Sequence, residues 1–500
     1  MTTAQRPGPP MPVAAHLRAR LRDAAAPVLV EGDRTLPGAT LWVAARTLVR
    51  QLRAAGLGPG DRVLVRTGDD LLVAVALVAG LTGGFTTALT AAVPPGGTPA
   101  DAVDARLVLC AASDLPDGAG PDGAGLPPWV AVAGIAGLAD PDRVAPRAAR
   151  HAPEPDVALL LHTSGSTGRP TWVALSQGNL DAVLASHLPV LFGDRWDAAD
   201  AARRPAGVIA SVLPWTHAFG AVLDLLVGLL AADVVLRDRR AGADPHRLAA
   251  LLERAGDGAW LSAVPLSLRR FADAVPDARE RLHRLGGGLV GGASCEPALC
   301  AVLAGSALRI GYGLTEAAPG VCLGDRGAFS PGLLGTPVGC RTEVVGGQLV
   351  VTGANVSVGV LDADGALVRR SVPRLPTGDT VRDGQRPHVY GGRVHDTVKL
   401  SSGRWVSLLD VDAAVLASTG VACAAQATDD AALVLLVDGD HGAARTVRTW
   451  LGHQAVPWTR AVRDVVAVPS GAWPRSPKGE LVRRPDPAWM PQPERTGQPT

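Results

Sequence analysis

Residues Leu159–Pro170 read LLLHTSGSTGRP, and this stretch decides the fold. An apolar run ends in alternating hydroxyl and glycine residues, which predicts a buried strand entering a turn. The backbone N–H groups and hydroxyls of such a turn can face a phosphate, because glycine lets the chain approach an anion closely. A plain linker is the alternative interpretation of a Gly/Ser-rich loop. The position of this loop directly after an apolar strand favours a phosphate loop.

The overall composition indicates a globular chain and gives no sign of a nucleic-acid partner. Five hundred residues exceed what one hydrophobic core usually holds, so we expect two or more domains. The 48 basic and 47 acidic residues give a net charge of +1, and no long basic tract predicts nucleic-acid binding. The six cysteines form no CxxC pair and are predicted to be buried free thiols in a reducing compartment. With no signal-peptide pattern at the N-terminus, we expect a cytoplasmic protein.

One apolar stretch raises the question of a membrane span. Leu71–Val93 contains 23 residues without a charge, which is long enough to cross a bilayer. Its Gly83-Gly84 and Thr86-Thr87 interruptions, and the acidic pair Asp69-Asp70 before it, favour a buried helix followed by a strand. We therefore expect no membrane association.

Helices and strands are predicted to alternate along the chain. Residues 40–55 place apolar side chains on one helical face, and Gly56 ends that helix. Val63–Val65 is expected to be a strand, Asp70–Gly80 a helix and Phe85–Leu89 a strand. Later helices are predicted over 179–191, 411–418 and 441–450, and later strands over 206–213 and 432–437. This alternation is typical of an α/β domain with a mostly parallel sheet.

The order TSGSTG-x-P resembles the phosphate loop of the adenylate-forming (ANL) superfamily, which includes acyl-CoA synthetases, firefly luciferase and peptide-synthetase adenylation domains. Four further segments are similar to motifs of that superfamily: LPWTHAFG at 213–220, GGGLVGGA at 286–293, YGLTE at 312–316 and PTGD at 376–379. The resemblance implies an α/β fold with a large N-terminal AMP-binding domain of mostly parallel and mixed sheets, 1–395. It further implies a hinge at Asp396 and a small mobile α+β domain over 396–484, followed by a tail, 485–500, that we expect to be flexible.

The resemblance also implies which residues hold AMP. Tyr312 would border the adenine, Thr315 would contact the α-phosphate, and Asp379 with Arg393 would contact the ribose. The full predicted AMP-binding set is Thr163, Ser164, Gly165, Ser166, Thr167, Gly168, Gly291, Gly292, Ala293, Gly311, Tyr312, Gly313, Leu314, Thr315, Asp379 and Arg393. Glu316 is a hard oxygen ligand of the kind that Mg²⁺ prefers, if the ion is used. A polar turn that merely closes a strand is the alternative for YGLTE.

Two further segments are implied to serve thioester chemistry. His217 matches a histidine near the acyl carboxylate and the thiol channel, although a capping or packing histidine is the alternative at such a position. The segment from Lys399 to Ser407, KLSSGRWVS, is similar to the glycine-rich turn of acyl-CoA ligases and carboxylic acid reductases. Gly403, with Lys399, Ser402 and Arg404, would line the tunnel for the pantetheine arm of CoA.

Two positions depart from the superfamily pattern in the same direction. Pro474–Arg484 matches the end motif P-R-x-x-x-G-K-x-x-R-R, but the position of the adenylation lysine holds Glu480. The phosphate loop, which usually continues Pro-Lys-Gly, has Thr171 in place of its lysine. A carboxylate ~4 Å from a phosphate oxygen is repelled by a few kcal/mol even with screening. Losing one preorganised cation costs about two to three decades in rate. Lys478 lies two residues before Glu480. A one-residue shift of the loop that contains both could place the Lys478 ammonium in the position of the missing lysine.

These departures predict a non-adenylating acyl-CoA ligase that converts acyl-AMP and CoA into acyl-CoA and AMP. Such a chain resembles the non-adenylating member of split acyl-CoA ligase systems in platensimycin/platencin-type diterpenoid pathways, where a separate adenylating ligase supplies the acyl-AMP. The small residues Gly286–Gly288 and Ala218 are expected to leave room for a bulky hydrophobic acid. The alternatives are a complete ATP-dependent acyl-CoA synthetase, rescued by Lys478 or Arg475, and a catalytically silent AMP-binding protein. Free CoA and carrier-bound phosphopantetheine present the same thiol arm, so both remain candidate thiols.

Overall fold

The structure, a computed structural model, describes most of the chain in two compact units. The described residues are 12–91, 99–115, 127–163, 171–200, 206–382, 386–400, 405–428, 431–454 and 456–469. The first unit is drawn from Met1–Glu343, Val350–Pro376 and Arg386–His388, and the second from Val344–Leu349, Thr377–Gln385 and Val389–Thr500. The fold is α/β, with mixed sheets and helices in each unit.

A nine-stranded sheet forms the centre of the first unit. Its order is β20-β19-β9-β8-β4-β3-β5-β6-β7, and the pairs β3–β4, β3–β5, β4–β8 and β5–β6 are parallel. The strands are β3 (Arg62–Arg66), β4 (Thr86–Thr90), β5 (Leu107–Cys110), β6 (Val130–Gly134), β7 (Gly137–Leu138), β8 (Val157–Thr163), β9 (Thr171–Ser176), β19 (Gly359–Leu361) and β20 (Leu367–Arg369). The parallel centre is the mostly parallel sheet that the alternating helices and strands predict.

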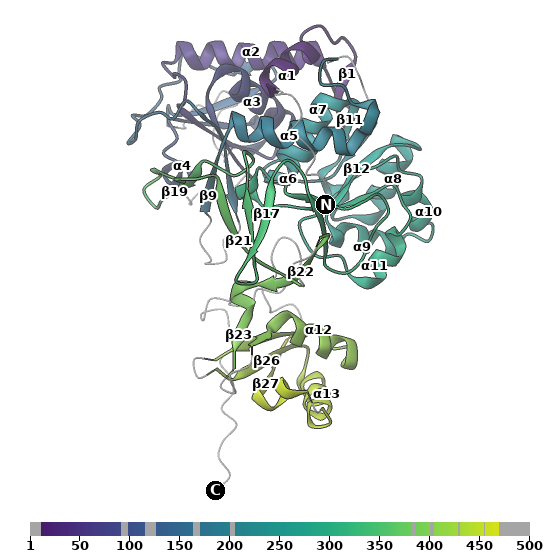
Figure 1. The fold of residues 1–500 in the computed structure, drawn as a ribbon. Coiled ribbons are helices and arrows are strands. Elements are labelled where there is room, and N and C mark those ends of the chain that lie inside the picture. Colours follow the sequence, from purple (N-terminus) through teal and green to yellow (C-terminus); the bar gives the residue numbers. More distant parts are fainter. Residues whose placement is uncertain are drawn as a thin grey trace. The chain divides into compact units, whose positions relative to one another are not determined.

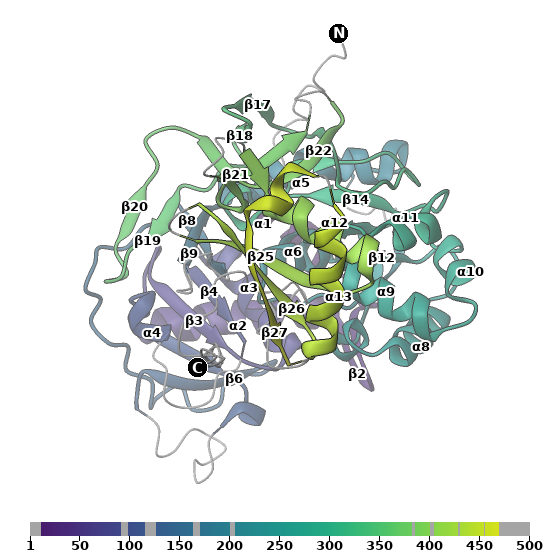
Figure 2. The same ribbon diagram turned by 90° about the horizontal axis from the view of Figure 1, so that it is seen from below.

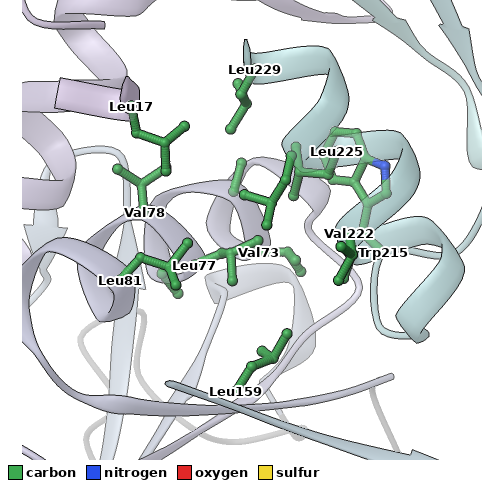
Figure 3. Packing of buried hydrophobic residues seen from close by; sticks show 14 of the residues in the cluster. Leu17, Val73, Leu77, Val78, Leu81, Leu159, Trp215, Val222, Leu225 and Leu229 are labelled. Atoms are coloured by element: carbon green, nitrogen blue, oxygen red, sulfur yellow. The ribbon is translucent and has the colours of Figure 1, made fainter. Parts of the chain in front are cut away.

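Helix α3 (Asp70–Gly83) is buried along nearly its whole length. Asp69 caps its first turn by accepting hydrogen bonds from the amides of Leu71 and Leu72, and Gly84 ends it in the left-handed conformation. The helix packs against α2 (Gly38–Ala54) and α1 (Val13–Leu21). Figure 3 shows Val73, Leu77 and Leu81 of α3 within this core, which explains why the stretch is apolar all round.

Among the described residues, no helix has both the length and the apolar character needed to cross a bilayer. The uncharged stretch from Leu71 is divided between α3 and the buried strand β4. The prediction of a buried helix followed by a strand is therefore confirmed.

A second sheet of the first unit has the order β12-β10-β11-β1-β2, and its first four strands run parallel. The strands are β1 (Pro27–Glu31), β2 (Arg34–Pro37), β10 (Gly207–Ser211), β11 (Ala232–Arg237) and β12 (Trp260–Ser262). Helices gather beside this sheet in Figure 1: α8 (Pro245–Ala255), α9 (Pro265–Ala274), α10 (Ala278–His283) and α11 (Pro297–Leu303). The strand expected over 206–213 ends at Ser211 because Pro214 opens a turn.

The remaining strands of the first unit carry two of the segments that are predicted to bind AMP. Strands β13 (Leu289–Gly291), β14 (Arg309–Tyr312), β15 (Cys322–Leu323) and β16 (Leu333–Pro337) are consecutive neighbours. Helices α4 (Pro99–Ala102), α5 (Gln177–Phe192), α6 (Ala218–Gly220) and α7 (Val227–Ala231) complete the unit. The strands that contain the borders between the units are β17 (Arg341–Val345), β18 (Gln348–Thr352), β21 (Arg374–Arg382) and β22 (His388–Arg393).

The second unit contains a small α+β body. Strands β25 (Cys423–Ala427), β26 (Leu433–Asp438) and β27 (Val462–Val468) form a sheet, and α12 (Leu408–Thr419) and α13 (His441–Gly452) pack against it and each other. Figure 2 shows both helices beside the three strands. A hairpin of β23 (Thr397–Lys399) and β24 (Trp405–Ser407) precedes α12. All six cysteines are free; five are buried and Cys340 is half-buried.

Candidate active site

Strands β8 and β9 flank the predicted phosphate loop. Leu159, Leu160 and Leu161 are fully buried, as expected for a strand entering such a loop. Thr163 at the end of β8 pairs with Thr171 at the start of β9, and its hydroxyl donates to the Thr171 carbonyl at 3.5 Å. The loop residues Ser164, Gly165, Ser166, Thr167 and Gly168 lie outside the described residues. Thr163 and Thr171 are therefore the described residues that border the loop.

Two segments of the predicted AMP-binding set lie next to each other. Strands β13 and β14 are parallel, with Gly291 opposite Gly311. A Cβ atom on Gly291 would lie 2.5 Å from the Gly311 carbonyl oxygen, so only glycine permits this approach. Gly292 follows with a φ of +87°, and Ala293 is half-buried. The two strands thus approach each other closely at this pair of glycines, and their contact with adenine stays a prediction.

The segment after β14 folds back on itself tightly. A Cβ atom on Gly313 would lie 1.4 Å from the Pro319 carbonyl oxygen. Thr315 and Glu316 lie in a 3-10 turn (Thr315–Ala317), which packs against β8 and β9. The Glu316 carbonyl accepts a hydrogen bond from the Ser357 amide at 2.9 Å. Tyr312 and Leu314 are half-buried against a small apolar cluster around Val321 and Val351.

His217 stands at the start of α6 with its side chain exposed. Its ring lies 5.4 Å from that of His162, the residue before Thr163, in an edge-to-face arrangement. His162 in turn makes an edge-to-face contact with Trp172, also at 5.4 Å. Burial lowers the pKa of His162 below its usual range, so its imidazole is neutral at pH 7. The described residues therefore place His217 next to the strand that enters the phosphate loop.

The first unit thus brings several predicted residues together. The end of β8 contacts the Thr315–Ala317 turn and His217, while β13 and β14 pair through Gly291 and Gly311. Phe219 of α6 lies 3.7 Å from the position of a Cβ on Gly291. His162 and Trp172 were not predicted as site residues, because a histidine and a tryptophan in adjacent strands carry no local pattern of their own.

The space expected beside Gly286–Gly288 is filled. A Cβ atom would lie 2.2 Å from the Gly258 carbonyl oxygen at Gly286, 2.5 Å from the Trp260 ring at Gly287 and 1.8 Å from the Leu261 carbonyl oxygen at Gly288. Ala218 is 5% exposed and belongs to the main core. The expectation that these residues leave room for a bulky acid is therefore wrong: they permit close packing instead.

The predicted ribose-binding pair lies in the second unit. Asp379 on β21 is opposite Arg393 on β22, and the Arg393 Nε lies 3.0 Å from the Asp379 Oδ1. Asp379 is 4% exposed, and its amide donates to the Thr377 hydroxyl at 3.1 Å. A carboxylate fixed in this way is suited to accept hydrogen bonds from two neighbouring hydroxyl groups.

The predicted hinge and pantetheine residues also belong to the second unit. Asp396 is half-buried in a 3-10 turn (Val394–Asp396). Lys399 is exposed at the end of β23 and pairs with Trp405, so the KLSSGRW turn connects the two strands of a hairpin. Ser402, Gly403, Arg404 and Glu480 lie outside the described residues. Their predicted roles stay predictions.

Within the described residues, a magnesium ion would need additional ligands from substrate or water. The described part of the chain contains no group of three or more His, Cys, Asp or Glu side chains that could hold a metal. Mg²⁺ commonly binds through one or two carboxylates plus phosphate oxygens and water. The predicted ligand Glu316 would fit that mode as a single carboxylate, with substrate phosphate supplying further oxygens.

A buried polar cluster lies next to the His217 turn. It consists of Asp70 at the start of α3, Ser211 and Arg237 at the ends of β10 and β11, Trp215, and Asp224 in a π-helical segment (Ala221–Leu226). The Trp215 Nε1 donates to the Ser211 hydroxyl and to the Asp224 Oδ2, each at 3.1 Å. The Ser211 hydroxyl also donates to Asp224.

Arg237 completes this cluster. Its Nε donates to the Asp70 Oδ2 at 2.9 Å and its Nη1 to the Ser211 hydroxyl at 3.1 Å. Its guanidinium carbon lies 4.4 Å from the Trp215 ring centroid. Burial raises the pKa of Asp224 to about 6, and the charge of Asp70 acts in the same direction. The hydrogen bonds from Ser211 and Trp215 and the charge of Arg237 act in the opposite direction and lower the pKa. Nearby Glu31 also has a raised pKa, through burial and then Asp70.

Asp224→Asn is expected to flatten the pH dependence of stability. A carboxyl whose pKa rises from 3.8 to about 6 on folding binds more protons in the folded state, so its contribution falls as pH rises between those values. One pKa unit corresponds to about 1.4 kcal/mol. Between pH 4 and 7, the free energy of unfolding of the wild type should therefore fall by about 2–3 kcal/mol relative to that of the variant. Glu31 titrates in both proteins, so its contribution cancels when the free energies of unfolding of the wild type and the variant are subtracted. Urea unfolding at several pH values measures this, and a difference that stays constant with pH contradicts it.

Residues 17–371 match the protein family described as AMP-binding enzyme, and the chain belongs to that family. Its fold is shared with proteins of known structure that include ATP-bound MatB from Rhodopseudomonas palustris. The two share 21% identity with a TM-score of 0.72 over 95% of this chain and 98% of the other.

Two curated relatives show how far sequence similarity extends. The long-chain-fatty-acid–AMP ligase FadD26 of Mycobacterium bovis is 30% identical over 244 residues, which cover 45% of this chain and 40% of the relative. The novobiocin biosynthesis protein H of Streptomyces niveus is 29% identical over 445 residues, covering 80% of this chain and 69% of the relative. The match to FadD26 therefore spans less than half of that relative's length.

Proposed function

We propose that this protein is a non-adenylating acyl-CoA ligase, which transfers an acyl group from a ready-made acyl-AMP to CoA. The observation that carries the proposal is the paired loss of positive charge at Thr171 and Glu480. In the adenylate-forming enzymes that this chain resembles, the lysines at both positions serve the first half-reaction, in which ATP and the acid form the acyl-adenylate. The residues predicted for AMP, the hinge and the thiol tunnel are retained.

The proposed reaction needs no phosphoryl chemistry. The CoA sulfur attacks the acyl carbon, the carbon–sulfur bond forms, and the bond from that carbon to the phosphate oxygen of AMP breaks. AMP leaves with the electron pair, and the thiol proton passes to the exposed imidazole of His217. Positioning of the thiol and stabilisation of developing charge are the main requirements. Asp379 and Arg393 would hold the ribose, and Gly291 and Gly311 would admit the adenine.

The source of the acyl-AMP would be a separate adenylating ligase. An acyl-adenylate is a mixed anhydride that hydrolyses in water, so a supplying enzyme and this protein would act in succession. Similarity to novobiocin biosynthesis protein H supports a search for the acyl group among antibiotic precursors. Similarity to a fatty-acid–AMP ligase supports the alternative of a complete ATP-dependent enzyme.

The test supplies synthetic acetyl-, octanoyl- and benzoyl-AMP with CoA to the purified protein. We expect acyl-CoA and AMP to form at least about 100-fold faster than without enzyme. In a parallel reaction, ATP with the matching acids should release no pyrophosphate above background. Brisk pyrophosphate exchange would instead establish the complete ligase, and failure of both reactions the catalytically silent binding protein.

A further inference from the structure

We propose that Trp215 is a positioning residue, which fixes His217 through the buried polar cluster of Asp70, Ser211, Arg237 and Asp224. The inference rests on the proposed function for its kinetic test, because His217 is assigned there as the acceptor of the thiol proton. Its structural basis is independent of that assignment.

Trp215 and His217 belong to one tight turn. The His217 amide donates to the Pro214 carbonyl at 3.2 Å, and a Cβ atom on Gly220 would lie 2.1 Å from the same carbonyl oxygen. The backbone of the turn is therefore in contact with the start of α6. Within the turn, Trp215 is 1% exposed, whereas His217 is exposed. Trp215 is the large anchor, and His217 projects from the same short segment.

The Trp215 side chain is held in one orientation. Figure 3 shows its ring beside Val222 and Leu225, which fix its position but not the direction of its N–H group. That direction is set by Ser211 and Asp224, which both accept from Nε1 at 3.1 Å. Arg237 lies over the ring at 4.4 Å and is itself tied to Asp70. Contacts from three separate chain segments thus converge on one indole.

The polar character of the cluster favours positioning over stability. The Arg237–Asp70 ion pair is buried, with side-chain exposures of 0% and 9%. Replacing such a pair by well-packed apolar residues is often neutral or stabilising, so the pair gives weak support to folding. The hydrogen bonds from the indole N–H to Ser211 and Asp224 still define a single geometry, although the Asp224 Oδ1 and the Arg237 Nη2 make no hydrogen bond among the described residues. Here the geometry that they define is that of the turn two residues before His217.

Trp215→Phe is the central variant, because it keeps an aromatic ring near Arg237 and removes the indole N–H together with the second ring that carries it. Trp260→Phe is the matched control: Trp260 belongs to the same core and is 6% exposed, and its Nε1 has no hydrogen-bond partner among the described residues. We expect Trp215→Phe to lower kcat for thioester formation from octanoyl-AMP by about 10- to 100-fold, with KM changed far less. Trp260→Phe should keep wild-type kinetics.

A double-mutant cycle separates positioning from a general structural effect. In a His217→Ala background, Trp215→Phe should cause no further loss of kcat, since the residue it positions is gone. An equal loss in both backgrounds overturns the proposal. Should Trp215→Phe fail to fold by circular dichroism, Asp224→Asn, which keeps the size of the side chain, takes its place with the same expectations.

A second readout does not depend on the proposed reaction. In protein labelled at the histidine ring carbons, the His217 signal is identified by its loss in His217→Ala. We expect the NMR chemical shift of this signal to change in Trp215→Phe and to stay the same in Trp260→Phe. If the wild type forms no thioester, the proposed function fails but this shift still supports positioning. A His217 signal unchanged by Trp215→Phe overturns the inference whatever the activity.

Discussion

The double variant Glu480→Lys, Thr171→Lys is expected to gain ATP-dependent adenylation. Each substitution restores a cation at a position where the resembling enzymes carry one, and the first also removes a carboxylate. A preorganised cation at a transferring phosphoryl group is worth about 10²–10³-fold in rate. We therefore expect pyrophosphate exchange with octanoic acid to rise by about that factor in the double variant and by less in Glu480→Lys alone. Thioester formation from octanoyl-AMP should stay within a few-fold of wild type.

Glu480→Gln is the control for this gain. It removes the negative charge without adding a positive one, so it should recover only a small part of the exchange activity. Lys478→Ala tests whether the neighbouring ammonium already serves ATP in the wild type; a wild-type exchange reaction abolished by this change would favour the complete ligase. No gain in either lysine variant would mean that the missing charges do not limit adenylation.

Much of the fold could be predicted because its signals are local. The helix expected over Asp70–Gly80 is observed as Asp70–Gly83, with Asp69 capping it as an acidic residue before an apolar run should. The strand expected over 432–437 is observed as Leu433–Asp438, and the helix over 411–418 as Leu408–Thr419. In each case the apolar run, joined for the two helices by a capping residue, lies within one element.

The buried cluster under His217 could not be predicted, because its partners are distant in the sequence. Asp70 and Arg237 are 167 residues apart, and Asp70 appears in the sequence only as part of a helix start. Trp215 stands within the LPWTHAFG segment, but nothing in that segment indicates that its indole meets Asp224. Contacts of this kind depend on how strands β10 and β11 are ordered in the sheet.

The glycines show the same division between local and distant information. The glycines of GGGLVGGA permit another group to approach the backbone closely, and protein groups do so at Gly286, Gly287, Gly288 and Gly291. They do not reveal which group approaches. At Gly287 it is the Trp260 ring and at Gly288 the Leu261 carbonyl, so space that seemed open to a substrate is occupied by the protein.

Gly313→Ala is expected to abolish nucleotide binding while leaving the fold largely intact. The added Cβ would lie 1.4 Å from the Pro319 carbonyl oxygen, a distance that no pair of non-bonded atoms can tolerate, so the backbone between Gly313 and Pro319 must move apart. This segment carries Thr315 and Glu316, and Ala318 within it already has a φ of 58°, so it has little freedom to adjust. Displacing a positioned group by 1 Å lowers the reaction rate by about 100-fold, and we expect at least that loss in kcat/KM for acyl-AMP.

Gly134→Ala is the matched control, because its Cβ would meet no atom within 4 Å and its φ is not positive. AMP titration by calorimetry should give wild-type affinity for Gly134→Ala and no measurable heat for Gly313→Ala. Overpacking costs about 1–3 kcal/mol, so Gly313→Ala should still unfold cooperatively, at a lower urea concentration. Because the strain is confined to one loop beside β8 and β9, loss of binding without loss of the fold would tie AMP recognition to this loop. Wild-type AMP affinity in Gly313→Ala would place the nucleotide elsewhere.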